Sequence, residues 1–328
     1  MCLPQVPFVR GGAEIFTDEL VRQLRARGHE ADVVSVPFKW YPGQRVLTQA
    51  FLWRLLDLTE ADGRPIDLVV ATKFPSYCVR HPNKVVWLLH QFRQAYELDR
   101  TELGQFSESA EDRATRGRVQ RLDEVALGEA QKLFATSGNV AGRLRRSTGL
   151  EAEVLPHPPQ ELAYRTDAYE PFVFSVGRLD RAKRLDLLIQ AAARQNVDLV
   201  IAGEGPDRER LESLANGRVR FAGRVTEDEL ADLYARCRAV FYAPVDEDFG
   251  MVPFEAFLAE KPVVTTTDAG GPLDVVHDRE TGRVVEPTVE AVAAALAIGE
   301  DDAQAWGRAG KTLAERVTWD SAIDRLLA

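Results

Sequence analysis

The sequence is poor in cysteine and in positive charge. Its 328 residues include three cysteines, Cys2, Cys78 and Cys237, which are far apart and follow no CxxC spacing. This pattern gives neither a metal site nor a disulfide framework and indicates reduced thiols in a cytoplasmic protein. The formal net charge is −10. A nucleic-acid-binding protein is therefore not expected, because it would need a basic face to neutralise phosphates.

Long apolar runs are missing as well. No stretch approaches the roughly 20 apolar residues that span a bilayer, and residues 1–10 lack the charged region and apolar core of a signal peptide. We expect a cytoplasmic protein and leave peripheral contact with the inner membrane surface open. The aromatic-rich stretch 40–58 is expected to be a core helix, with contact to a lipid-linked or glycan acceptor as the alternative.

The chain does contain enough apolar residues, 45%, for two domain cores. In the second half, short β-branched or aromatic runs alternate with helical patterns, which predicts a doubly wound α/β sheet of parallel strands. Ligands of such sheets bind at the carboxyl ends of the strands. The predicted strands are 172–176, 197–202, 219–222, 239–243, 263–265 and 283–285, and the predicted helices are 184–194, 207–215, 227–236, 254–259 and 290–298.

The first half is less regular. Only residues 1–6 are available for a first strand, and Pro4 interrupts them, so we expect a short first strand or a chain that starts upstream. The junction 157–171 contains three prolines and predicts a linker between domains 1–160 and 161–328, with the last helix packing back on the first domain. Also expected are a helix over 14–27, strands over 31–36, 67–71, 85–89 and 133–136, and a helix with loops in the polar stretch 91–118.

Two cations follow the predicted strand 172–176. Arg178 and Lys183 lie in the turn before the next helix. A helix N-terminus offers free N–H groups and the positive end of the helix dipole, and nearby cations add charge-assisted bonds to a phosphate. The pair therefore indicates a phosphate site, with two solvated surface residues as the alternative.

Two carboxylates, Glu247 and Glu255, are separated by seven residues after the predicted strand 239–243. Carboxylates accept hydrogen bonds from the hydroxyl pairs of sugars and ribose, and the turn with Gly250 and Met251 can direct backbone N–H groups at further hydroxyls. The alternatives are a solvated loop acid for Glu247 and, for Glu255, an acid stabilised by the helix dipole. The Asp-x-Asp at 246–248 lacks a third ligand, and we expect no metal there.

Glycine turns follow several predicted strands, at 11–12, 203–205 and 270–271. Each alone is an ordinary turn, but together they indicate backbone approach to a shared ligand cleft. His90 ends the predicted strand 85–89 and is a candidate substrate contact or a structural histidine. His157 stands among prolines and is interpreted as structural.

In their order and spacing, these motifs resemble those of glycosyltransferase family 4. The resemblance covers nearly the whole chain and is strongest over 172–287. It implies the GT-B fold, in which two Rossmann-like doubly wound domains face a cleft, the first binding the acceptor and the second the nucleotide-sugar donor. The motifs are GGAE at 11–14, VGRLDRAKRLDLLI at 176–189, IAGEGPDRERLE at 201–212, EDFGMVPFEA at 247–256 and DAGGPLDVV at 268–276.

The resemblance also implies a reaction and its residues. A sugar moves from a nucleoside-diphosphate sugar to an acceptor hydroxyl with retention of anomeric configuration, without a metal or cofactor. Two other classes stay open: a nucleotide-sugar epimerase or phosphorylase on the same fold, and a non-catalytic sugar-nucleotide-binding subunit. The implied contacts are Arg178 and Lys183 with the diphosphate, Glu255 with the ribose, Glu247, Gly250 and Met251 with the sugar, Gly12 with the phosphates and His90 with the donor sugar.

Overall fold

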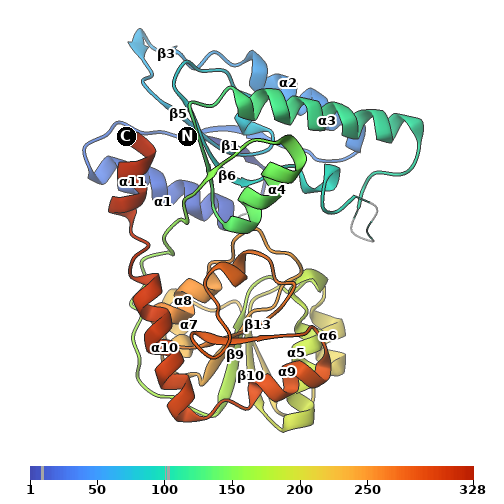
Figure 1. The fold of residues 1–328 in the computed structure, drawn as a ribbon, viewed down its shortest axis with the longest axis vertical. Helices are drawn as coiled ribbons and strands as arrows, with labels where there is room; N and C mark the ends of the chain where they lie inside the picture. The colour runs from blue at the N-terminus through green and yellow to red at the C-terminus, as the bar shows by residue number, and fades with distance from the viewer. Residues whose placement is uncertain (9–10, 100, 102–103) are drawn as a thin grey trace. The chain divides into compact units, whose positions relative to one another are not determined.

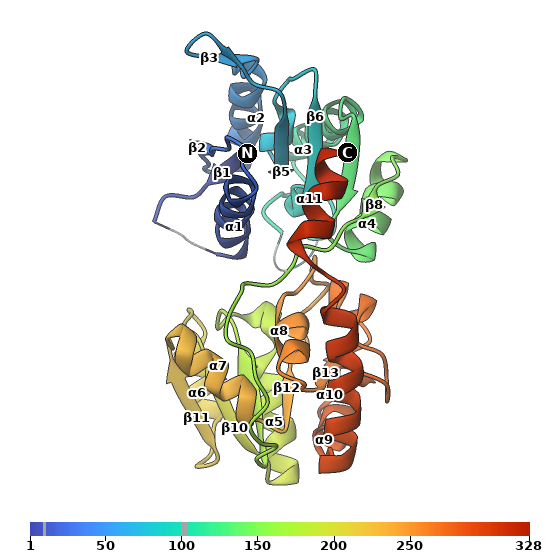
Figure 2. The ribbon, with the colours of Figure 1, turned by 90° about the vertical axis from the view of Figure 1, so that its left-hand side faces the viewer.

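The chain folds into two compact units. The computed structural model describes residues 1–8, 11–99, 101 and 104–328. Contacts group Met1–His157 with Trp319–Ala328 as unit 1, and Pro158–Thr318 as unit 2 (Figure 1). The boundary falls three residues before the expected one at 160, and the last helix, α11 (Trp319–Leu327), belongs to unit 1 (Figure 2).

Unit 1 is built on a six-stranded parallel sheet in the order β2-β1-β5-β6-β7-β8. Beside it stands a two-residue hairpin, β3 (Glu60–Ala61) with β4 (Arg64–Pro65). The sheet order reverses between β1 and β5, which marks the place where such sheets leave a crevice at their carboxyl ends. The sheet strands are β1 (Cys2–Gln5), β2 (Val34–Pro37), β5 (Val69–Lys73), β6 (Lys84–His90), β7 (Lys132–Ala135) and β8 (Glu153–Val154).

The first strand corrects one expectation, because Pro4 lies inside β1 and does not interrupt it. The carbonyls of Met1 and Gln5 accept hydrogen bonds from Val34 and Phe38, so the odd-numbered residues of β1 bond to β2. Pro4 therefore turns its missing N–H towards β5, where the pairing is restricted to Cys2 and Ala71. A proline is tolerated at a position whose ladder bond is not needed.

Helices cover both faces of this sheet, and successive strand residues point to opposite faces. Val70 and Trp87 pack with α1 (Gly12–Ala26) and α11. Val86 and Leu88 pack with the helices of the other face, which are α2 (Val46–Leu55), α3 (Ala110–Gly128) and α4 (Gly138–Thr148). In the polar stretch 91–118 the structure shows a 3-10 turn at Arg93–Ala95 and then α3, which the Ser109 side chain caps by accepting from the Asp112 backbone N–H.

A buried carboxyl ties the segment after β6 to α3. Asp123 is fully buried and accepts hydrogen bonds from the Tyr77 and Tyr96 hydroxyls, both at 2.8 Å, and from Gln91 Nε2 at 3.3 Å. Burial raises the pKa of Asp123 to about 7, although these three donors pull it down. The group is therefore neutral in the folded protein below that pH.

This raised pKa predicts a stability that falls as pH rises. Between about pH 4 and about pH 7 the unfolded chain has lost the Asp123 proton and the folded chain still holds it. A shift of about three units corresponds to ~4 kcal/mol of unfolding free energy lost across that window. The measurement is urea unfolding from pH 4.5 to 8, with Asp123→Asn as the comparison. The difference in the free energy of unfolding between the wild type and Asp123→Asn should shrink as pH rises. A difference that stays constant would contradict the raised pKa of Asp123.

Unit 2 is a second six-stranded parallel sheet, in the order β11-β10-β9-β12-β13-β14. Numbered within the unit this is 3-2-1-4-5-6, the order of dinucleotide-binding sheets. All six predicted strands form, which confirms the α/β class with two doubly wound sheets. The strands are β9 (Phe172–Val176), β10 (Asp198–Ala202), β11 (Val219–Gly223), β12 (Ala239–Phe241), β13 (Val263–Thr266) and β14 (Gly282–Val285).

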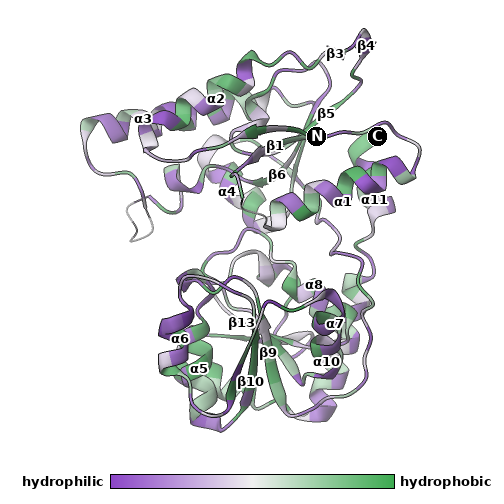
Figure 3. Ribbon diagram, turned by 180° about the vertical axis from the view of Figure 1, so that it is seen from behind, coloured by the Kyte–Doolittle hydropathy of each residue, from purple (hydrophilic) through white to green (hydrophobic). Residues whose placement is uncertain are grey.

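The strands of unit 2 are hydrophobic along most of their length, as Figure 3 shows for β9 and β10, because helices cover both faces. Val173 and Phe241 face one helical layer, and Phe174 and Val240 face the other. The first layer holds α5 (Leu185–Gln195), α6 (Arg208–Leu214) and α9 (Val289–Leu296), and the second holds α7 (Glu227–Arg236), α8 (Val252–Leu258) and the end of α10 (Glu300–Ala314).

The predicted linker is packed against unit 2. The Asp167 and Ala168 N–H groups donate to the carbonyl of Ala235, and the Tyr169 hydroxyl donates to the carbonyl of Glu260 at 2.9 Å. Lys261 lies 3.6 Å from the centre of the Tyr169 ring. The prolines of this stretch therefore mark an irregular but anchored segment.

Candidate functional site

The loops that carry the predicted donor residues meet where the sheet order of unit 2 reverses. β9 and β12 are neighbours there, and their crossover helices leave in opposite directions. Arg178 and Lys183 follow β9, and Glu247 follows β12. Lys183 Nζ forms an ion pair with Glu247 and lies 3.3 Å from the Tyr242 hydroxyl. The structure thus brings together residues that are 64 positions apart in the sequence.

The Lys183–Glu247 pair is half-enclosed, with side chains 22% and 23% exposed. Burial by itself lowers the pKa of Lys183, but Tyr242 and Glu247 outweigh it, and the net pKa is raised. The ammonium group also lies 5.3 Å from the centre of the Tyr242 ring. Lys183 therefore stays charged at every physiological pH.

Backbone hydrogen bonds hold the three loops of this site in register. Val245 N–H donates to the Ala182 carbonyl at 2.8 Å, which joins the loops after β12 and β9. Glu247 N–H donates to the Ala269 carbonyl at 2.8 Å, which joins the loops after β12 and β13. Gly250 has φ +84°, and a Cβ there would lie 2.8 Å from the Tyr242 ring. The turn with Gly250 and Met251 accordingly requires glycine at this position.

Glu255 lies on α8 and is buried beneath this turn, only 9% exposed. The Tyr234 hydroxyl, from α7, donates to Glu255 Oε2 at 2.6 Å. Burial raises the pKa of Glu255, and the Tyr234 hydrogen bond opposes that rise. Tyr234 is thus the group that favours the ionised form of this carboxyl, which is the form that accepts hydrogen bonds from a diol.

The glycines at 203 and 205 have a packing role. A Cβ at Gly203 would lie 1.9 Å from the Gly177 carbonyl oxygen, and one at Gly205 would lie 2.2 Å from that of Leu179. The turn after β10 therefore presses directly on the turn that carries Arg178. Arg178 itself is 66% exposed, with its Nε 3.9 Å from an Asp180 carboxylate oxygen. The structure places this guanidinium in solvent, and its contact with a phosphate stays a prediction.

The predicted residues of unit 1 lie at the carboxyl edge of its own sheet. Gly12 begins α1, and His90 ends β6 with its Nδ1 2.7 Å from the Gln91 carbonyl oxygen. Lys73 ends β5 and lies 3.4 Å from Glu14, which also accepts a hydrogen bond from the Gly11 N–H. Lys73 was not among the predicted residues, because the predicted strand ended at residue 71 and β5 extends to Lys73. The expected cleft between the two domains stays a prediction.

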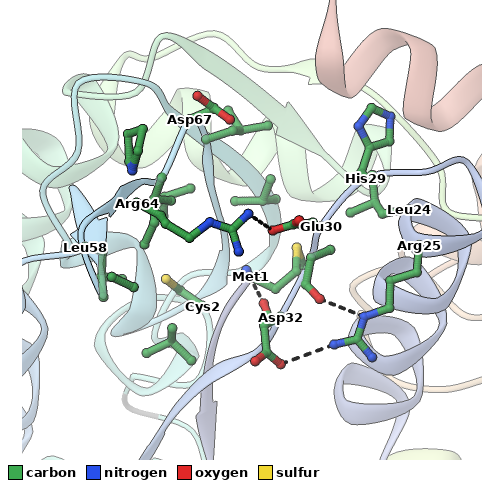
Figure 4. A pocket seen from close by; sticks show the side chains of 18 of the residues that line it. Met1, Cys2, Leu24, Arg25, His29, Glu30, Asp32, Leu58, Arg64 and Asp67 are labelled. Carbon is green, nitrogen blue, oxygen red and sulfur yellow. Dashed lines mark hydrogen bonds and ion pairs between the residues drawn. The ribbon is translucent and has the colours of Figure 1, made fainter.

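A large cavity of about 940 Å³ lies at the opposite, amino edge of the unit 1 sheet (Figure 4). Its cations already have partners: Arg64 forms an ion pair with Glu30, Arg25 lies 3.5 Å from the Asp32 carboxylate, and the Met1 amine donates to the Asp32 backbone carbonyl. Ligands of doubly wound sheets bind at the other edge. The candidate site is therefore the edge that holds the predicted residues.

Two further site residues had weak or no signals in the sequence. Tyr242 directly follows β12, so its position near a strand end could have drawn attention. Tyr234 lies on α7, and nothing in its spacing indicates a contact with Glu255.

Over the described part of the chain, no group of three or more His, Cys, Asp or Glu side chains is arranged to hold a metal ion. Within the same residues, none of the helices is long and apolar enough to cross a membrane.

Two doubly wound units in one chain define the GT-B class of fold. Solved structures agree over the full length of the chain. A sucrose-phosphate synthase from Thermosynechococcus elongatus superposes with a TM-score of 0.77 at 22% identity, covering 99% of this chain and 96% of that one. The glycosyltransferase WaaG, involved in lipopolysaccharide biosynthesis, gives a TM-score of 0.71 at 19% identity, covering 100% and 99%.

Residues 163–312 match the family described as glycosyl transferases group 1, which confirms the glycosyltransferase resemblance over unit 2. The chain is 40% identical over 113 residues to a GDP-mannose-dependent alpha-mannosyltransferase of Mycobacterium tuberculosis, over 34% of this chain and 29% of that protein. It is 35% identical over 178 residues to a GDP-mannose-dependent alpha-(1-6)-phosphatidylinositol monomannoside mannosyltransferase of the same species, over 48% and 46%. The matched regions thus span less than half of either relative.

Proposed function

We propose that the protein is a retaining, metal-independent glycosyltransferase that moves a sugar from a nucleoside-diphosphate sugar to an acceptor hydroxyl. The observation that carries the proposal is the charged Lys183 paired with Glu247 at the switch point of unit 2, above the buried Glu255. The family match over residues 163–312 supports the same reaction class.

The cations act on the leaving group. As the anomeric C–O bond breaks, negative charge grows on the departing diphosphate, and Arg178 and Lys183 stabilise that charge more in the transition state than in the ground state. The acceptor oxygen attacks the same face of the sugar, and its proton passes to the leaving phosphate oxygen. Glu247 then needs no nucleophilic role.

The remaining residues hold the donor. Glu255 accepts hydrogen bonds from the ribose hydroxyls, and Glu247 with the backbone at Gly250 and Met251 binds the transferred sugar. When phosphate oxygens approach Lys183, they compete with Glu247 for the same ammonium group and release the carboxylate towards the sugar. In unit 1, Gly12 approaches the phosphates and His90 the donor sugar.

The relatives suggest which donor to test first. Both relatives described above carry GDP-mannose in their names, so GDP-mannose leads the panel and UDP sugars follow. We infer a glycan, lipid-linked or small-molecule acceptor, a role in cell-envelope polysaccharide or glycoconjugate synthesis, and a cytoplasmic location with peripheral contact at the inner membrane surface. The exposed apolar side chains of α2 support the last point.

The proposal is tested by thermal unfolding with GDP, UDP and their sugars, for the wild type and for Arg178→Ala and Glu255→Ala. A ligand that binds only the folded state raises the midpoint. We expect one nucleotide to stabilise the wild type by several degrees and both variants to lose the effect. A folded wild type that responds to none of them contradicts the donor site.

The two alternative functions, an epimerase or phosphorylase and a non-catalytic subunit, predict different results with the same purified protein. An epimerase would isomerise the free sugar nucleotide without any acceptor. A non-catalytic subunit would bind the nucleotide and transfer nothing to a panel of acceptors. The intact set of donor residues, Arg178, Lys183, Glu247 and Glu255, favours transfer over both.

A further inference from the structure

Helix α2 is apolar on two opposite faces. Val46, Ala50 and Trp53 are buried in the core of unit 1. Phe51, Leu52 and Leu55 point outward and are 56%, 44% and 81% exposed. A surface helix normally turns a polar face to water, and a helix that is apolar all round is normally buried. In the described part of the chain, the outward face of α2 is therefore apolar and yet exposed to solvent.

The turn before α2 extends this apolar surface. Trp40 and Tyr41 are 43% and 54% exposed, and their rings touch edge to face at 4.9 Å. Phe38 lies two residues before Trp40, and its ring centre is 6.2 Å from that of Phe74 and 6.4 Å from that of Phe92. Those two residues follow the ends of β5 and β6, so the aromatic turn lies at the carboxyl edge of unit 1, where Lys73 and His90 also lie.

The charge of this segment differs in sign from that of the protein. The chain has 51 acidic residues and a net charge of −10, yet residues 33–56 contain no Asp or Glu. Their charges are Lys39, Arg45 and Arg54. Arg54 is paired with Glu129, whereas Lys39 and Arg45 are exposed, with Lys39 Nζ 4.8 Å from the Tyr41 ring centre. Within residues 33–56 all the charged side chains are therefore cationic, and the neighbouring carboxylate of Asp112 on α3 is bonded to Gln44 at 2.8 Å.

We propose that the outward face of α2 and the Trp40–Tyr41 turn, together called the α2 surface, dock the protein on a bilayer that contains anionic lipid. Trp and Tyr rings favour the membrane interface, and an apolar helix face flanked by Lys and Arg binds there by burial and by attraction to anionic headgroups. A second copy fits less well, because a two-fold contact packs the same surface of both copies together and would bring Lys39 and Arg45 of each copy into one interface.

This docking would hold the carboxyl edge of unit 1 at the lipid surface. That consequence deepens the proposed function and rests on it, because an acceptor anchored in lipid must reach this edge. The docking itself is independent of catalysis, so vesicle binding and donor binding can fail separately.

The test is co-sedimentation of the full chain with vesicles of phosphatidylcholine alone or mixed with about equal phosphatidylglycerol, without any sugar donor. We expect binding to the anionic vesicles at least ~10-fold above binding to the neutral ones, weakened by salt. The combined substitution Phe51→Ser, Leu52→Ser and Leu55→Ser should reduce binding at least ~10-fold. The matched control is Leu214→Ser, an exposed leucine on α6 of unit 2, which should leave binding unchanged.

A second variant protects the test against misfolding of the first. Lys39→Glu with Arg45→Glu leaves the apolar face intact and should abolish the preference for anionic vesicles, with the thermal midpoint and nucleotide-induced stabilisation unchanged. Equal binding by wild type and both variants overturns the proposal. So does an α2 variant that converts a dimer to a monomer in light scattering while the wild type ignores vesicles, because a second copy would then occupy the surface.

Discussion

Replacing Lys183 by alanine is expected to lower the turnover number ~10²–10³-fold with a much smaller change in thermal stability. The side chain lies at the switch point of unit 2, charged and held by Glu247 and the Tyr242 hydroxyl. Removing one preorganised group that faces developing negative charge typically costs that much in rate. The measurement is initial-rate kinetics with the donor identified by thermal stabilisation.

Lys311→Ala provides the matched control for this prediction. Lys311 is also an ion-paired lysine of unit 2, 2.9 Å from Glu260, but it lies on α10 and away from the strand ends. Its loss should leave turnover within a factor of about two, because this partly exposed pair contributes little energy and lies away from the carboxyl ends of the strands. Equal losses in the two variants would mean that the effect of Lys183 is structural and that the phosphate assignment is wrong.

Replacing Tyr234 by phenylalanine is expected to raise the KM for the donor ~10–100-fold at neutral pH, with a smaller effect on kcat. A hydrogen bond to a charged group contributes roughly 1.5–3 kcal/mol. Without the 2.6 Å bond from Tyr234, burial raises the pKa of Glu255 further, and a smaller fraction of that carboxyl is ionised. Donor affinity should therefore recover as pH is raised, at a higher pH than in the wild type.

Tyr164→Phe serves as the comparison for Tyr234→Phe. The Tyr164 ring lies 6.1 Å from that of Tyr234, and its buried hydroxyl has no hydrogen-bond partner among the described residues. Its removal should shift neither KM nor the pH profile. Tyr234 acts through Glu255 and is a positioning residue, so a lower melting midpoint with an unshifted pH profile would refute that role.

The fold of unit 2 could be predicted nearly element by element because its strands are buried on both faces. The segment 172–176 and the helix 227–236 match β9 and α7 residue for residue. Unit 1 was harder, because its first strand contains a proline whose acceptability depends on which neighbour it faces. The helix α3 also begins inside a stretch that is polar throughout, so periodicity gave no start point before the Ser109 cap.

The site divides in the same way. Motif order was enough to predict which loops carry charge, and the structure joins Lys183 with Glu247 as the sheet order requires. The Tyr234 contact with Glu255 was not predictable, because it depends on how α7 packs beside α8 on the same face of the sheet. The anchoring of 164–171 on unit 2 was missed for a related reason, since its hydrogen bonds run to backbone carbonyls that have no signature in sequence.

Because α11 belongs to unit 1, the two units differ in when all of their residues have been synthesised. Unit 2 is continuous in the chain, so all of its residues are synthesised before Trp319 is added. Unit 1 begins earlier and finishes later, because its face formed by Phe16 and Trp87 is covered by Trp319, Ile323 and Leu326. The core of residues 1–157 is therefore complete only after the residues of α11 have been synthesised.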